Sequence, residues 1–214
     1  MKLLFVLFFV LASNAAYSLG WAEKVIEKVN AASSLGCGKY PDIDDLQTKF
    51  DCESAFLNVS NSLYIGWLTS DKVERKDDLF CFWDRGNSNR ENFNEIFANP
   101  IVRLNVASLL GQLNKIKQLD LNLEEQREYA RSFISSDNKV FLLDSIHSLG
   151  WTGEHSDAQY LLKLIKKEEQ GVAENAVLAL INLLNNDYHK TLTELNVSLK
   201  RESLKNFIEE KLSQ

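Results

Sequence analysis

The stretch Ile101-Val-Arg-Leu-Asn-Val-Ala-Ser-Leu-Leu-Gly111 sets a pattern that returns twice later in the chain. The first return is Val140-Phe-Leu-Leu-Asp-Ser-Ile-His-Ser-Leu-Gly150, and the second is Val172-Ala-Glu-Asn-Ala-Val-Leu-Ala-Leu-Ile-Asn182. Each begins with a β-branched apolar residue and ends with an aliphatic residue followed by Gly or Asn. The starts, at 101, 140 and 172, are 39 and 32 residues apart. Repeats of this length predict a short α-solenoid, in which helical hairpins stack and present an extended surface.

Helical periodicity extends over most of the remaining chain. Only two prolines and nine glycines occur in 214 residues, which argues against a strand-and-turn architecture. Residues 53–69 carry enough apolar side chains to predict a long buried helix, and Pro100 suits the first turn of a helix. The sequence therefore predicts an all-α protein with an N-terminal helical segment over 19–98, repeats over 99–185 and capping helices over 186–214.

The best-formed repeat resembles a known family. It runs from Asp137 to Gly150, continues after a short loop with Ser156-Asp-Ala-Gln-Tyr-Leu-Leu-Lys-Leu-Ile165, and is followed by a new unit from Gly171. This order resembles the short HEAT-like repeats first described in phycobilisome lyases, over about residues 99–185. The resemblance implies stacked helical hairpins, and it brings no catalytic residue because that family has none in common. Asn182 replaces the Gly, and Ser145 the Ala, that the pattern favours.

The first 18 residues have the composition of a secretory signal. Lys2 precedes the apolar run Leu3-Leu-Phe-Val-Leu-Phe-Phe-Val-Leu11, and small residues follow, so that cleavage after Ala15 or Ser18 fits. An uncleaved anchor is the alternative, but the run is shorter than the ~20 residues that span a bilayer. We therefore expect an exported protein, periplasmic or secreted, with no transmembrane segment after the signal is removed.

The net charge of −6 and the pI near 5.2 are acidic. Binding to nucleic acid depends on Lys and Arg that neutralise phosphates, so the balance disfavours such a partner. It mildly favours a basic protein partner, although charge can also serve solubility alone.

Three cysteines stand in the first half of the chain: Cys37, Cys52 and Cys81. In an exported protein we expect one disulfide and one remaining thiol. The short connection favours Cys37–Cys52, and Cys52–Cys81 is an alternative. Cys81 is enclosed by Leu79-Phe80 and Phe82-Trp83, which predicts a buried thiol.

Few residues are candidates for chemistry. His147 lies within an apolar repeat, where a structural role is expected, and His155 follows Glu154 in a turn. No third ligand stands at useful spacing, so the sequence predicts no metal, no cofactor and no catalytic group. Trp83, Arg85 and Trp151 adjoin polar turns and are candidate binding anchors, unless each Trp packs under its own turn.

Three hypotheses for function follow. The first is a non-enzymatic scaffold that binds another protein through Trp83, Arg85, Trp151, Glu154 and His155. The second is a periplasmic inhibitor or immunity-type protein. The third is an enzyme with a site between the N-terminal segment and the repeats, for which the unpaired Cys and His155 are the best candidates.

Overall fold

The structure is a computed structural model that describes residues 20–69 and 75–214. The described residues form helices connected by turns and contain no strand, which confirms the all-α class. The predicted signal lies outside the described residues. Within the described ranges, no helix combines the length and the apolar character needed to cross a bilayer. The chain divides into two compact units, and the boundary between them along the sequence falls between Leu109 and Leu110, within one helix.

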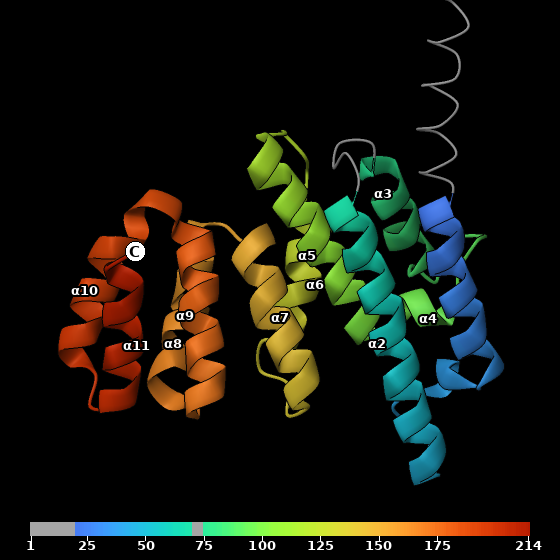
Figure 1. Cartoon of the computed structure of the whole chain (residues 1–214), viewed down its shortest axis with the longest axis horizontal. Helices are drawn as coiled ribbons and strands as arrows, with labels where there is room; N and C mark the ends of the chain where they lie inside the picture. The colour runs from blue at the N-terminus through green and yellow to red at the C-terminus, as the bar shows by residue number, and fades with distance from the viewer. Residues whose placement is uncertain (1–19, 70–74) are drawn as a thin grey trace, which may run out of the picture. The chain divides into compact units, whose positions relative to one another are not determined.

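The first unit holds a helix over residues 20–34 and four further elements before the dividing helix (Figure 1). These are η1 (Cys37–Lys39), α2 (Leu46–Thr69), α3 (Lys76–Arg85) and α4 (Glu95–Ala98), and the first half of α5 (Pro100–Lys117) completes the unit. At the starts of α2 and α4, side chains satisfy backbone N–H groups, as N-caps do. Asp45 accepts from the Thr48 N–H at 2.7 Å, and Asn94 accepts from the Ile96 N–H at 2.9 Å.

Cys37 and Cys52 form a disulfide that joins η1 to α2, with their Cα atoms 5.3 Å apart. The predicted pairing is confirmed. Tyr40, just after η1, also contacts α2. Its ring packs edge-on against Phe56 at 5.3 Å, and its hydroxyl donates to Glu53 at 3.0 Å. The turn that carries Cys37 is therefore held to α2 by covalent, aromatic and polar contacts.

An aromatic cluster forms the centre of the first unit. Trp21 donates its indole N–H to the Ser62 carbonyl at 2.7 Å and meets Phe82 edge-on at 5.6 Å. Phe82 in turn stacks on Phe97 at 5.1 Å. Gly66 lies against the Trp21 ring, where any side chain would overlap the indole. This cluster connects the first helix, α2, α3 and α4.

Two predictions for this unit are wrong. Cys81 is exposed, because α3 turns Leu79, Phe82 and Trp83 inward at helical spacing and leaves Cys81 on the opposite face. The helix predicted over 53–69 begins at Leu46 and is not buried all round, since Leu57 is exposed.

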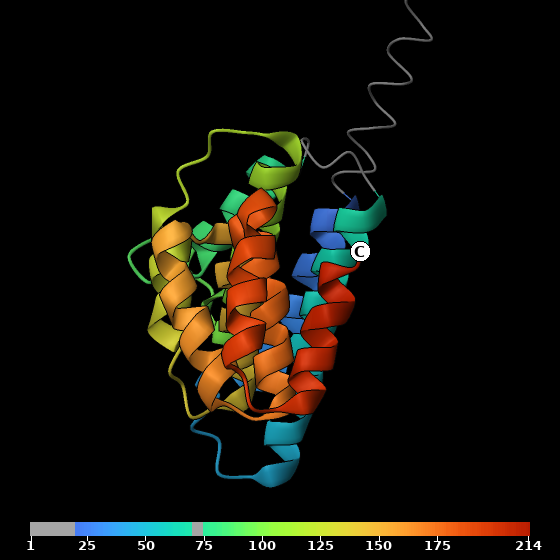
Figure 2. The same ribbon diagram turned by 90° about the vertical axis from the view of Figure 1, so that its left-hand side faces the viewer.

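The second unit contains the last turns of α5 and the rest of the chain (Figures 1 and 2). Its elements are α6 (Glu124–Phe133), α7 (Lys139–Thr152), η2 (His155–Asp157), α8 (Ala158–Lys167), α9 (Gln170–Leu184), η3 (Asn185–Asp187), α10 (Tyr188–Ser198) and α11 (Glu202–Leu212). Helix α7 packs against α6 and α9, α8 packs against α9, and α11 packs against α9 and α10. The three repeated stretches are thus the helices α5, α7 and α9.

Equivalent glycines of the first two repeats allow close helix contacts. A Cβ on Gly111 would lie 2.7 Å from the Trp151 backbone carbon of α7, and one on Gly150 would lie 2.8 Å from the Ala179 Cα of α9. Such distances are too short for a methyl group. The Gly that ends each of these stretches therefore sets how closely the next repeated helix approaches.

Candidate binding surface

The structure buries one of the predicted anchors. Trp83 is only 3% exposed, and the Arg103 guanidinium lies 4.0 Å above its ring. The expectation of an exposed anchor at Trp83 is therefore wrong, because this residue belongs to the inward face of α3. Arg85 ends the same helix half-buried, and its carbonyl accepts from the Asn94 N–H at 2.7 Å.

Glu154 and His155 lie at the turn between α7 and α8, both exposed. Glu154 forms a capping box with Asp157 and binds Arg131 at 3.1 Å and Arg127 at 3.7 Å. Its pKa is lowered by a hydrogen bond from Ser156 and then by Arg131. The structure gives Glu154 a role in holding this turn to α6.

Trp151 is half-buried at the C-terminal end of α7, and its contacts are with His147 and Lys115 rather than with the Glu154 turn. Its indole N–H donates to His147 Nε2, one turn earlier, at 3.3 Å. Lys115 from α5 lies 6.0 Å from the centre of the Trp151 ring. The lysine also donates to the Gly150 carbonyl at 3.0 Å and to the Asn182 carbonyl at 2.8 Å.

Lys115 therefore meets the C-terminal ends of both α7 and α9. The last carbonyls of a helix have no partner within the helix and carry partial negative charge, so a cation there is stabilising. No local pattern could indicate this role, because the two acceptors lie 35 and 67 residues further along the chain.

A hollow of about 260 Å³ opens between α7 and α9 beside this group. Its lining residues are His147, Asn175, Leu178, Ala179, Ile181 and Asn182. Leu178 is exposed although it is a large aliphatic residue. We define the α7–α9 face as Asp144, His147 and Trp151 of α7, Asn175, Leu178 and Asn182 of α9, and Lys115.

The ionisable groups of this face are shifted towards their neutral forms. Burial raises the pKa of the Asp144 carboxyl to about 7 and lowers that of the Lys115 ammonium to about 8. His147 is exposed as a residue, yet the neighbouring helices displace enough water from its ring to lower its pKa as well. At pH 7 Lys115 therefore keeps most of its positive charge, Asp144 is partly protonated and His147 is neutral, so the α7–α9 face combines an aromatic ring, aliphatic side chains and amides with one ammonium bonded to the helix ends.

The raised pKa of Asp144 should make the free energy of unfolding depend on pH. An unfolded Asp releases its proton near pH 4, whereas the folded chain holds it to about pH 7. Between these values the folded state binds more protons, so stability falls as the pH rises. Asn cannot ionise, and we expect Asp144→Asn to gain stability relative to the parent from about pH 4 to pH 7.5. Urea unfolding at both pH values checks this; a pH-independent difference would contradict it.

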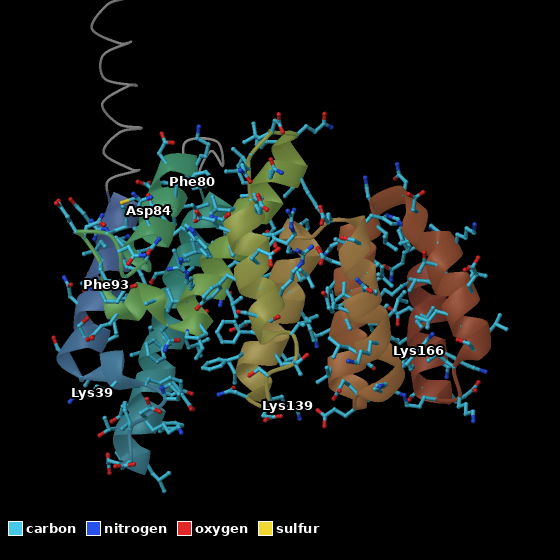
Figure 3. The ribbon with its side chains drawn as sticks, turned by 180° about the vertical axis from the view of Figure 1, so that it is seen from behind. Lys39, Phe80, Asp84, Phe93, Lys139 and Lys166 are labelled. Atoms are coloured by element: carbon cyan, nitrogen blue, oxygen red, sulfur yellow. A yellow bond between two sulfur atoms is a disulfide. The ribbon has the colours of Figure 1, made fainter. Side chains whose placement is uncertain are left out.

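A larger cavity of about 650 Å³ lies at the N-terminal ends of α7 and α9. Ile134, Leu142, Leu164 and Val172 form its buried apolar floor. Lys139, at the start of α7, forms an ion pair with Glu169 at its rim (Figure 3). Three lysines and three acidic residues line the cavity, so it selects no sign of charge.

Within the described ranges, no three His, Cys, Asp or Glu side chains gather closely enough to hold a metal ion. Of the five residues predicted from the sequence, only Trp151 lies on the α7–α9 face. His147, Lys115 and the amides of α9 were missed as binding residues. His147 could have been found from the sequence, because Trp151 follows it by four residues and so lies on the same helix face. Comparisons of the chain with protein-family models, with curated proteins and with solved structures found no match.

Proposed function

We propose that this chain is an exported, non-enzymatic HEAT-like repeat protein that binds another protein through the α7–α9 face. The observation that carries the proposal is the hollow lined by His147 and the exposed Leu178, with the half-buried Trp151 bonded to that His. Aromatic side chains on a rigid support are typical anchors of protein interfaces. The exposed Leu178 and the Trp151 ring favour contact with an apolar or aromatic segment of the partner.

The repeat architecture of the proposal is supported by the equivalent glycines. Gly111 and Gly150 each allow the following repeated helix to approach at backbone distance. A stack of hairpins requires this contact to recur once per repeat. The disulfide between Cys37 and Cys52 suits an oxidising compartment and so supports export.

Trp151→Ala tests the binding surface. We expect this variant to weaken partner binding by more than about 1 kcal/mol, or roughly fivefold in Kd, because an anchor ring is lost from the centre of the interface. The partner is first captured from the exported fraction of the source cell, and its affinity for purified parent and variant is then measured by calorimetry.

Tyr160→Ala is the matched control. Tyr160 is an exposed aromatic residue of the same unit, but it lines the larger cavity outside the α7–α9 face. We expect it to leave the affinity unchanged. If Trp151→Ala leaves binding unaltered and Tyr160→Ala weakens it, the proposal is wrong and the partner binds at the larger cavity. Equal thermal unfolding of all three proteins ensures that affinity, and not folding, is compared.

A further inference from the structure

Helix α2 carries large apolar side chains on two opposite faces. One face packs into the first unit through Cys52, Phe56, Val59 and Leu63, all fully buried. The other face is open: Leu46 is 82% exposed, Phe50 64%, Leu57 59%, Ile65 62% and Leu68 76%. A helix that is apolar all round is normally covered on all sides. In the described part of the chain, nothing covers this second face.

Four of these five exposed side chains, together with Tyr64, follow a heptad-like spacing along the helix, and Ile65 lies beside this stripe. The stripe consists of Leu46, Phe50, Leu57, Tyr64 and Leu68. Tyr64 is half-buried. Spacings of four and seven residues keep a stripe in line over many turns, as needed when two long helices pack side by side. An isolated surface leucine would need no explanation, but a stripe as long as the helix does.

The spacing is also symmetric about Leu57. Leu46 and Leu68 are each 11 residues from it, and Phe50 and Tyr64 are each seven residues from it. A stripe with this symmetry matches itself when a second copy is laid alongside in the opposite direction. Leu46 then faces Leu68 of the second copy, Phe50 faces its Tyr64, and Leu57 faces Leu57 on the two-fold axis.

We propose that α2 is a homodimerisation helix that pairs antiparallel with α2 of a second copy, with Leu57 on the two-fold axis. An isologous contact of this kind uses the same patch on both chains. The inference does not depend on the proposed function, because it concerns the first unit alone.

Polar side chains in the stripe favour the antiparallel direction. Glu53 and Asn61, both exposed, fill the two gaps of the stripe, four residues to either side of Leu57. In an antiparallel pair each Glu53 faces an Asn61, whose amide N–H groups are donors that suit a carboxylate. A parallel pair would instead bring the two Glu53 carboxylates together, and like charges repel. Glu53 already accepts from the Tyr40 hydroxyl, which holds its carboxylate at the edge of the stripe.

The area is that of a small dimer interface. A helix of 24 residues is ~36 Å long and ~10 Å wide. Packing one such helix along another removes several hundred Å² from each chain, approaching the ~800 Å² per partner of a standard interface.

Sedimentation equilibrium of the exported chain at micromolar concentration tests the pairing. We expect the parent to have twice the monomer mass and Leu57→Glu to be a monomer, because two carboxylates would meet on the axis. Val197→Glu is the control: it places the same charge at an exposed Val, 84% accessible, on α10. It should remain a dimer. A monomeric parent would overturn the proposal, as would a dimeric Leu57→Glu.

Cysteine cross-linking tests the direction, in a Cys81→Ser background that removes the exposed thiol. We expect a mixture of Leu46→Cys and Leu68→Cys chains to form a 46–68 disulfide between copies. Leu46→Cys alone should not cross-link, since antiparallel pairing separates the two positions by ~33 Å. Cross-linking of Leu46→Cys alone would overturn the proposal in favour of a parallel pair. A monomeric parent that floats with lipid vesicles would overturn it in favour of a membrane surface.

Discussion

Arg131→Met is expected to lose about 3–5 kcal/mol of its free energy of unfolding, because it leaves a buried carboxylate without its counter-charge. Asp157 is fully buried, and Arg131 Nε donates to its Oδ1 at 2.7 Å. The other carboxylate oxygen accepts from the Glu154 N–H at 2.9 Å. The hydrogen bond with Asp157 is the main reason that the pKa of Arg131 is raised. Urea unfolding followed by circular dichroism measures the loss.

Arg127→Met is the matched control, one helical turn earlier on α6. Arg127 pairs with the exposed carboxylate of Glu154 at 3.7 Å, and a pair with an exposed partner contributes about 1 kcal/mol or less. In an Asp157→Asn background, Arg131→Met should cost much less than in the parent, since no buried charge then remains. Equal losses for Arg127→Met and Arg131→Met would contradict this account of the buried pair.

Loss of the Cys37–Cys52 disulfide should cost about 3 kcal/mol. The bond joins cysteines 15 positions apart, and closing a loop of that length lowers the entropy of the unfolded chain by about that amount. The variant Cys37→Ala/Cys52→Ala and the reduced parent should both unfold at lower urea concentration. Comparing the two separates the bond itself from the lost packing of the sulfur atoms.

Cys81→Ser controls for changes at cysteine in general. Cys81 is exposed and unpaired, and surface substitutions usually change stability by less than about 0.5 kcal/mol. A disulfide-dependent loss no larger than that of Cys81→Ser would show that the connection between η1 and α2 persists without the bond.

Local pattern was enough to predict the repeated helices and the disulfide. Helices α5, α7 and α9 begin at Pro100, Lys139 and Gln170, within two residues of the predicted starts. Apolar periodicity indicates a helix whatever it packs against, and a short connection between cysteines limits the possible pairings.

Burial was harder to predict, because it depends on which faces of a helix are covered. Cys81 has apolar neighbours in sequence, but Leu79, Phe82 and Trp83 share one face and Cys81 lies on the other. Helical spacing contained this information, and proximity in sequence concealed it. On α2, by contrast, both faces are apolar, so no pattern within the helix could tell the covered face from the open one.

The binding surface could be predicted only in part. Trp151 was a candidate from its position beside a turn, while the hollow next to it forms only when α9 packs against α7. Helix starts were also displaced locally. The stretch Ser88-Asn-Arg-Glu91 has the spacing of a capping box, but Asn94 caps the short helix α4 instead. Several polar residues in succession offer competing caps, and packing selects among them.

Lys115 makes the second unit mechanically asymmetric. At the C-terminal ends of α7 and α9 a single ammonium is bonded to both helices, so moving them apart there breaks a hydrogen bond and leaves a carbonyl unpaired. At their N-terminal ends the two helices border the cavity of about 650 Å³ and are joined across it by an exposed ion pair. We therefore expect a force that separates α7 from α9 to widen this cavity before it breaks the Lys115 contacts. The N-terminal ends of α7 and α9 are thus the ends at which the two helices separate more easily.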